Sequence, residues 1–231
     1  MKNIYGNGKY LVSNPDWHTA DSPWKAKQII KILSKNHLNP STVCDVGCGA
    51  GEIIYQLYER LPSNTVFHGY EISPQAFKMC QTRKKDRIFF FLKDLLKEYN
   101  VFFDLVLAID VFEHIEDYFS FLRKLKNIGK YKIFHIPLDI SVQSVVRKRA
   151  IMNWRETYGH IHYFTKDIAL AALKDTGYEI IDYCYAPGSI ELPNRNFKSS
   201  LLEIPRRLLF SLNKDFTVRL LGGFSLMVLA K

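Results

Sequence analysis

Four acidic side chains and one glycine-rich turn follow short apolar runs in the first half of the chain, and these residues could bind a ligand. The turn occupies 43–51 and reads VCDVGCGAG. Glycine adopts positive φ at low cost because it has no Cβ, and it lets a ligand approach the backbone closely. Apolar residues then recur with helical spacing, so we expect the turn to join a strand to a helix whose first amide groups can bind an acceptor group.

The turn differs from the dinucleotide-binding fingerprint at one position. The pattern G-x-G-x-x-G requires a third glycine at position 52, where this chain has Glu52. A nicotinamide cofactor is therefore disfavoured. With Asp45 ahead of the glycines, the run reads D-x-G-x-G-x-G and resembles the class I S-adenosylmethionine-dependent methyltransferases.

Three features farther along the chain extend this resemblance. Glu71 ends the strand-like run 65–71, 20 residues after Gly51, where an acid would meet ribose hydroxyls in a nucleotide-binding α/β fold. Asp94 follows the apolar run 88–92, where the family places a polar side chain against the adenine amino group. The run FDLVLAIDVFEHI at 103–115 is similar to the family's fourth strand and the loop after it. The resemblance therefore covers about 42–115.

The resemblance implies that the chain binds S-adenosylmethionine. It assigns the glycines and Asp45 to the methionine part of this cofactor, Glu71 to the ribose and Asp94 to the adenine. Charge supports Asp45 and Asp110, because the cofactor carries an ammonium and a sulfonium group. The implied cofactor-binding residues are Asp45, Gly47, Cys48, Gly49, Gly51, Glu71, Ile72, Asp94, Leu95 and Asp110.

Methyl transfer from a sulfonium mainly requires that the acceptor be placed in line with the methyl group and that water be excluded. An acceptor that must lose a proton also needs a base, and histidine is the usual one. The foremost candidate is His162, for which the alternative is a hydrogen bond within its loop. The catalytic candidates are His162, Asp110, His114 and His160. For His114 the alternative is a structural role beside Glu113, and His160 ranks below His162.

Length and composition indicate one large α/β domain. The chain has 231 residues, of which 47% are hydrophobic and 14% aromatic, enough for a buried core. Its four cysteines form no C-x-x-C pair and no Cys/His cluster with zinc spacing, so we expect reduced thiols and assign no metal site. The first residues lack the apolar core of a signal peptide, and the final apolar run is too short to cross a bilayer. We therefore expect a cytoplasmic protein.

The pattern of apolar runs predicts a Rossmann-like α/β fold with helices on both faces of a mostly parallel, seven-stranded sheet. The expected strands lie near 42–47, 65–71, 88–92, 104–109, 131–136, 178–185 and 223–230, and in the family the last one is antiparallel. We expect a single domain over 1–231, with an N-terminal arm and helix at 1–40 and inserted, lid-like segments at 138–160 and 187–216. Trp17, His18 and Trp24 could line the pocket, although packing in the core is the alternative.

The predicted function is methyl transfer from S-adenosylmethionine to a small molecule, through oxygen, with a sugar or another metabolite as acceptor. The formal net charge of +9 suggests an anionic partner. Arg147–Arg149 and Arg155 could hold an anionic substrate group, or they could be a solvated surface. Nucleic acid is not expected, because IDVF follows the fourth strand instead of the Asn/Asp-Pro-Pro-Tyr/Phe motif of amino-methylating enzymes. An RNA methyltransferase, a quinone or lipid methyltransferase that contacts membrane, and a non-catalytic scaffold are the alternatives; the oligomeric state is left open.

Overall fold

The computed structural model describes residues 9–192 and 203–231, and its centre is a seven-stranded sheet with the order β3-β2-β1-β4-β5-β7-β6. The strands are β1 (Thr42–Val46), β2 (Val66–Glu71), β3 (Ile88–Leu92), β4 (Phe103–Ile109), β5 (Gly129–Pro137), β6 (Ile180–Ala186) and β7 (Ser225–Ala230). Strands β1 to β5 pair in parallel, whereas β7 pairs antiparallel with both β5 and β6. The predicted fold class is confirmed, including the antiparallel last strand.

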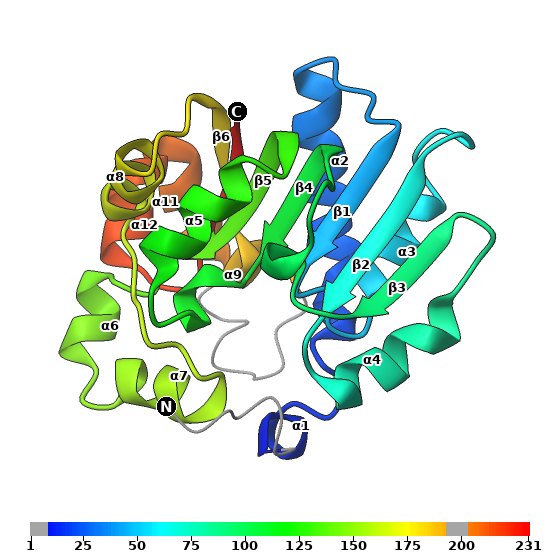
Figure 1. The fold of residues 1–231 in the computed structure, drawn as a ribbon. Coiled ribbons are helices and arrows are strands. Elements are labelled where there is room, and N and C mark those ends of the chain that lie inside the picture. The colour runs from blue at the N-terminus through cyan, green and yellow to red at the C-terminus, as the bar shows by residue number, and fades with distance from the viewer. Residues whose placement is uncertain (1–8, 193–202) are drawn as a thin grey trace.

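Helices cover both faces of this sheet (Figure 1). The described helices are α1 (Lys9–Ser13), α2 (Ser22–Lys35), α3 (Glu52–Tyr58), α4 (Pro74–Cys80), α5 (Tyr118–Lys126), α6 (Val142–Val146), α7 (Ala150–Thr157), α8 (Lys166–Asp175), α9 (Gly188–Glu191), α11 (Glu203–Leu212) and α12 (Lys214–Leu220). The sequence explains where two of these helices begin. The Ser73 side chain accepts the backbone N–H of Ala76 and caps α4, and the Thr165 side chain accepts that of Ile168 and caps α8. Helices α2 and α3 share one core cluster with the sheet, and α5 and α8 share the other.

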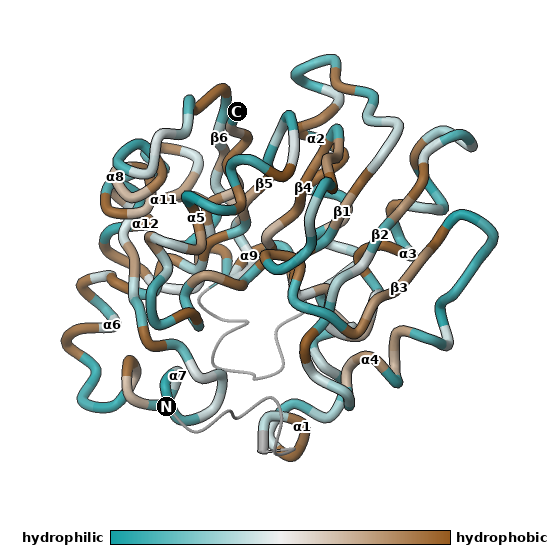
Figure 2. Tube along the Cα trace, viewed as in Figure 1, coloured by the Kyte–Doolittle hydropathy of each residue, from teal (hydrophilic) through white to brown (hydrophobic). Residues whose placement is uncertain are grey.

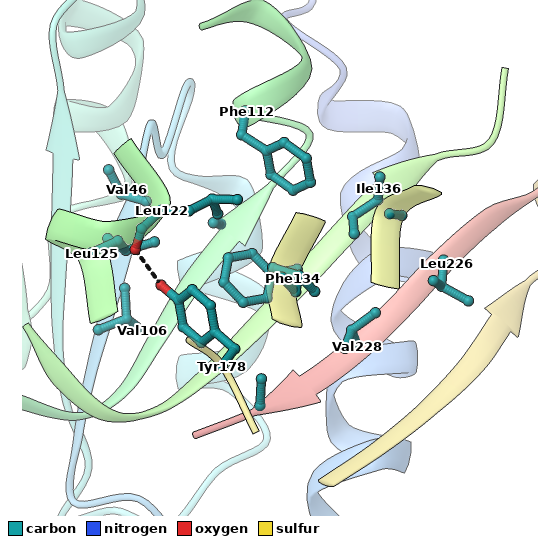
Figure 3. Packing of buried hydrophobic residues seen from close by; sticks show 14 of the residues in the cluster. Val46, Val106, Phe112, Leu122, Leu125, Phe134, Ile136, Tyr178, Leu226 and Val228 are labelled. Carbon is teal, nitrogen blue, oxygen red and sulfur yellow. Dashed lines mark hydrogen bonds between the residues drawn. The ribbon is translucent and has the colours of Figure 1, made fainter. Parts of the chain in front are cut away.

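The sheet is apolar on both faces because helices bury both of them. Figure 2 shows hydrophobic residues along the central strands and hydrophilic ones in the surrounding loops. In the larger cluster, Phe134 of β5 and Val106 of β4 are fully buried beneath Leu122 and Leu125 of α5 (Figure 3). The hydroxyl of Tyr178 reaches across this cluster and donates to the backbone oxygen of Leu122 at 2.8 Å. A rigid sheet thus supports the loops at its carboxyl edge.

The segments predicted as insertions contain their own short helices. Residues 138–160 form α6 and α7, and 187–216 include α9, α11 and the start of α12, while 193–202 of that segment lie outside the described residues. Helices α1, α6 and α7 lie beyond the carboxyl ends of the parallel strands, as Figure 1 shows. Over 9–192 and 203–231, no helix combines the length and apolar character needed to cross a membrane.

Candidate functional site

The glycine-rich turn between β1 and α3 adopts a backbone that only glycine accommodates without strain. Gly47, Gly49 and Gly51 have φ values of 69°, 55° and 77°. A Cβ on Gly49 would lie 2.7 Å from Cδ1 of Trp17, and one on Gly51 would lie 2.7 Å from Cζ of Phe90. The N-terminal arm therefore closes on the turn from one side, and the sheet closes on it from the other.

Glu71, at the end of β2, holds the turn through its carboxylate. Oε2 accepts the backbone N–H of Gly49 at 2.8 Å, and Oε1 accepts those of Ile72 and Ser73 at 2.8 and 2.7 Å. Burial raises the pKa of Glu71, although these three N–H donors act in the opposite direction. A carboxylate has about four acceptor positions, so one position on Oε2 is left to accept a ligand hydroxyl.

A cavity of about 520 Å³ lies at the carboxyl ends of β1 to β4, and we call it the Glu71 cavity. Its wall includes Glu71, Ile72, Asp94 and Leu95, four of the residues predicted to bind the cofactor. Asp94 uses Oδ1 to accept the backbone N–H of Leu96 at 3.0 Å, which orients its side chain at the cavity. The volume lies in the range of small-ligand pockets.

A second cavity of about 300 Å³, the His160 cavity, adjoins the first. Both cavities are lined by Tyr10, Trp17, Gly47, Asp110 and His114, so they share one wall. The other polar groups around the His160 cavity come from distant parts of the chain. They include His18, Lys25, His135, Tyr158 and His160.

Asp110 follows β4 with a positive φ of 54° and is already paired. Its Oδ2 lies 2.8 Å from Nζ of Lys25 on α2, and its Oδ1 lies 2.6 Å from Nδ1 of His135 on β5. Burial raises the pKa of Asp110, but His135 and Lys25 outweigh burial and hold this pKa well below its usual range. Lys25 therefore neutralises much of the charge that was predicted to face the cofactor.

Three titratable side chains meet beside the shared wall. Glu113 and His114 belong to the short helical turn after β4, and His160 comes from the loop between α7 and α8. Nε2 of His114 lies 3.7 Å from Oε1 of Glu113, and the rings of His114 and His160 are 5.0 Å apart. Burial raises the pKa of Glu113 well above its usual range, and Asp110 adds to this. Burial and His160 lower the pKa of His114 to about 4, so His114 is neutral at pH 7.

His162 and Asp45 are not among the described residues that line either cavity. Nε2 of His162 lies 2.9 and 3.2 Å from the backbone oxygens of Ile115 and Glu116. Carbonyl oxygens only accept, so this nitrogen must donate, and the geometry argues against His162 as the base. Asp45 is 2% exposed and lies within β1, beneath the turn. Its Oδ1 is buried and has no hydrogen-bond partner among the described residues.

The remaining predicted residues line the His160 cavity, pack in the core or lie on the surface. Cys48, Gly49 and His160 line the His160 cavity, as do Trp17, His18 and Trp24, while Gly51 packs into the core. The cationic run 147–149 is exposed and is not among the described residues that line either cavity; Arg149 pairs with Glu156 at 3.3 Å. This places the run on the solvated surface that was its alternative interpretation.

Several site residues were not identified from the sequence. They are Tyr10, Lys25, Glu113, Asp139 and Tyr158. Two of them carried a local signal: Glu113 precedes a histidine in the loop after an apolar strand. Lys25 lies on the apolar face of α2, where a charged side chain could have indicated a buried partner. The others reach the site through contacts between segments far apart in the sequence.

The arrangement suits a nucleoside ligand with a cationic tail. Glu71 has an acceptor position for a sugar hydroxyl, Asp94 lines the same cavity with Oδ2 3.8 Å from Nζ of Lys97, and the glycine turn leaves the backbone accessible. The loop after β4 and the turn after β1 meet at the carboxyl edge, where open parallel sheets bind ligands.

Comparisons with known proteins agree with this geometry. A family model described as a methyltransferase domain matches residues 17–183, which is most of the chain. Among solved structures, magnesium protoporphyrin IX methyltransferase of Synechocystis PCC 6803, with bound S-adenosylhomocysteine (SAH), is 16% identical with a TM-score of 0.60. That match covers 90% of this chain and 82% of the other.

Two further solved structures have the same fold. N-methyltransferase NodS of Bradyrhizobium japonicum WM9, also with SAH, is 14% identical over 89% of this chain and 84% of its own, with a TM-score of 0.56. The plantazolicin methyltransferase BpumL in complex with SAH is 14% identical over 97% and 87%, with a TM-score of 0.56. The chain belongs to the methyltransferase-domain family and is a class I S-adenosylmethionine-dependent methyltransferase.

Proposed function

We propose that this enzyme methylates a hydroxyl group of a small molecule, with a sugar or another hydroxylated metabolite as acceptor. The observation that carries the proposal is the wall shared by the two cavities. One cavity has the acidic side chains that suit a nucleoside, and the other collects imidazole and phenol groups. An acceptor in the His160 cavity would therefore lie next to the methyl group of a cofactor in the Glu71 cavity.

In this proposal the cofactor's adenosine part occupies the Glu71 cavity. Glu71 accepts from a ribose hydroxyl, Asp94 accepts from the adenine amino group, and the backbone at Ile72 and Leu95 borders the base. The methionine part passes Gly47 and the turn toward Asp110. When bound, the cofactor supplies an activated methyl group, so the chain's own task is to position the acceptor and exclude water.

The acceptor side favours oxygen because its lining groups suit the loss of a proton from a hydroxyl. His114 and His160 face the cavity, and each has Nδ1 engaged by an acceptor. Nδ1 of His114 lies 3.1 Å from the backbone oxygen of Gly159, and Nδ1 of His160 lies 2.6 Å from Oδ2 of Asp139. Both histidines therefore present Nε2 as a lone pair, which can accept a hydrogen bond or a proton.

Two measurements test this function. Calorimetric titration of the full chain with S-adenosylmethionine and with SAH should give saturable binding. A screen of hydroxylated metabolites and matched amines, with a labelled methyl donor, should then label hydroxyl acceptors. Labelling of amines alone would contradict transfer to oxygen, and a folded sample that binds neither ligand would contradict the cofactor site.

A lipid-linked acceptor is a second candidate, supported by exposed apolar side chains on two helices that touch each other. Helices α6 and α11 touch where Arg206 donates to Oε1 of Gln143 at 3.3 Å. Their exposed apolar side chains are Val142, Val145, Val146, Ile204, Leu208 and Leu212. Exposed arginines flank this surface, which suits anionic headgroups. Flotation with anionic vesicles tests it: retention on vesicles supports the candidate, and a protein that stays in the bottom fraction contradicts it.

A further inference from the structure

Glu113, His114 and His160 form a compact cluster of metal-ligand types. One ligand atom from each lies within 4.8 Å of the others. With bonds of about 2.1 Å, two ligands of one ion lie at most about 4.2 Å apart. Small side-chain rotations would therefore bring all three atoms to bonding distance. The spacing in the sequence conceals this cluster, because His160 lies 46 residues after His114.

The backbone holds the two segments of the cluster together. The amides of Ile161 and His162 both donate to the backbone oxygen of Glu113, at 3.0 and 3.1 Å. His114 in turn contacts the backbone oxygen of Gly159 through Nδ1. The loop that carries His160 is thus fastened to the turn that carries the other two ligands, and the cluster is preorganised before any ion binds.

Each histidine is oriented as metal-binding histidines usually are. In such sites the second ring nitrogen donates to a carboxylate or a backbone carbonyl, which fixes the tautomer and the ring. Here Asp139 takes this role for His160 at 2.6 Å, and Gly159 takes it for His114 at 3.1 Å. Both Nε2 atoms therefore carry a lone pair.

The buried carboxylate of Glu113 is evidence for a bound ion that does not depend on the spacing of the three side chains. Its side chain is 0% exposed, and within residues 9–192 and 203–231 neither carboxylate oxygen has a hydrogen-bond partner. Buried carboxylates are normally paired, hydrogen-bonded or bound to a metal. In its ionised form this carboxylate, whose Oε1 lies 3.7 Å from Nε2 of His114, requires a cation beside it.

We propose that Glu113, His114 and His160 bind one divalent transition-metal ion on the acceptor side of the active site. Two imidazoles and one carboxylate favour zinc, cobalt, iron or manganese over magnesium and calcium, which prefer oxygen ligands. Three protein ligands leave positions open toward the His160 cavity. The proposal of a metal site does not depend on which acceptor the enzyme uses, whereas a role of the metal in catalysis rests on the proposed function.

In catalysis the ion would act as a Lewis acid on the acceptor. The ion held by Glu113, His114 and His160 would make a nearby hydroxyl group more acidic, as it does for water. The hydroxyl proton would pass to solvent, and the oxygen lone pair would form the new C–O bond while the C–S bond of the sulfonium breaks and SAH leaves. The histidines serve as ligands in this scheme and do not themselves take the proton.

The test uses chelator-treated full-length protein titrated with Co²⁺, whose visible absorption reports on coordination. We expect saturable binding of one ion per chain, displaced by Zn²⁺. Glu113→Gln and His160→Ala should each weaken binding at least a hundredfold, and Asp139→Asn about tenfold to a hundredfold. His162→Ala is the matched control, because that imidazole bonds to backbone oxygens, and it should bind Co²⁺ as the wild type does.

Folding and cofactor binding are measured on the same samples. Glu113→Gln should unfold at the wild-type temperature or above it without metal, because it removes a buried carboxylate whose oxygens have no hydrogen-bond partner in the described part of the chain. Absence of one-to-one binding in folded protein, or undiminished binding by both Glu113→Gln and His160→Ala, would overturn the metal site. Titration with S-adenosylmethionine separates the two proposals: metal binding without cofactor binding would refute the proposed function alone.

Discussion

The two cavities of the active site are built in different ways. Around the Glu71 cavity, most of the bonds that hold the acidic side chains come from nearby backbone groups. Glu71 accepts from Ile72 and Ser73 as well as from the more distant Gly49, and Asp94 accepts from Leu96. Around the His160 cavity, side chains are held by partners far away. Lys25 pairs with Asp110, for example, and Asp139 pairs with His160.

In the proposed function, this difference separates the residues that bind the cofactor from the residues that bind the acceptor. Cofactor binding is placed on the turns after parallel strands, whose geometry follows from the sheet itself. In the same proposal, the acceptor binds against the N-terminal arm and the segment after β5, which lie outside the sheet. Four predictions, from the largest expected effect to the smallest, test whether the two halves are independent.

Replacement of Lys25 by methionine should have the largest effect, because this lysine joins the arm's helix to the end of β4. The variant leaves Asp110, whose side chain is 24% exposed, with His135 as its remaining partner among the described residues, and breaking a largely buried pair costs about 3 kcal/mol. In a chain of this size we expect the melting temperature to fall by roughly 8 °C. Lys35→Met is the matched control, since its pair with Asp182 at 2.9 Å is exposed and should contribute less than about 1 kcal/mol. Equal losses in both variants would contradict the buried role.

The second prediction is that one substitution in each cavity changes a different quantity, either cofactor affinity or the rate of methyl transfer. Glu71→Ala should weaken S-adenosylmethionine binding at least about a hundredfold, or about 2.7 kcal/mol, because the turn loses its anchor and the ribose loses its acceptor. His160→Asn should leave cofactor affinity within about twofold and lower methyl transfer instead. Calorimetry and a labelled-methyl assay measure the two quantities. If His160→Asn weakened cofactor binding as much as Glu71→Ala, the two halves would not be separable.

The pH dependence of stability should carry a contribution from His114. Its pKa is about 4 in the folded chain and about 6.5 when unfolded, so in that interval the unfolded chain binds the proton that the folded chain excludes. The free energy of unfolding should therefore fall by about 2 kcal/mol as the pH drops from 6.5 toward 4. Metal-free protein is compared with His114→Asn by urea unfolding across this interval. The raised pKa of Glu113 changes the free energy of unfolding in the opposite direction in both proteins, so it does not produce a difference between them. If the free energy of unfolding depended on pH identically in both proteins, His114 would make no contribution.

The smallest effect is expected for His162→Ala. Loss of the hydrogen bonds to the oxygens of Ile115 and Glu116 should cost about 1 kcal/mol of stability. Methyl transfer to the acceptor found by screening should be kept, because the imidazole is not among the described residues that line either cavity. A loss of turnover with an unchanged melting temperature would restore His162 as a catalytic residue.

The sequence by itself determined the sheet and the cofactor side. The glycine turn, Glu71 and Asp94 could be located because each follows an apolar strand within a few residues, and the carboxyl ends of parallel strands meet at one edge. The pattern of apolar residues also predicted the positions of all seven strands. These features depend on local spacing, which a single sequence contains.

Only the tertiary structure decided which histidines line the His160 cavity. His160 and His162 are two residues apart and look equivalent in the sequence, yet His160 is fixed by Asp139 at the cavity while His162 turns to the backbone after β4. Likewise, the buried carboxylate of Glu113 meets His160 only because two loops are joined by backbone hydrogen bonds. Contacts between distant segments depend on the packing of the whole chain, so no local pattern records them.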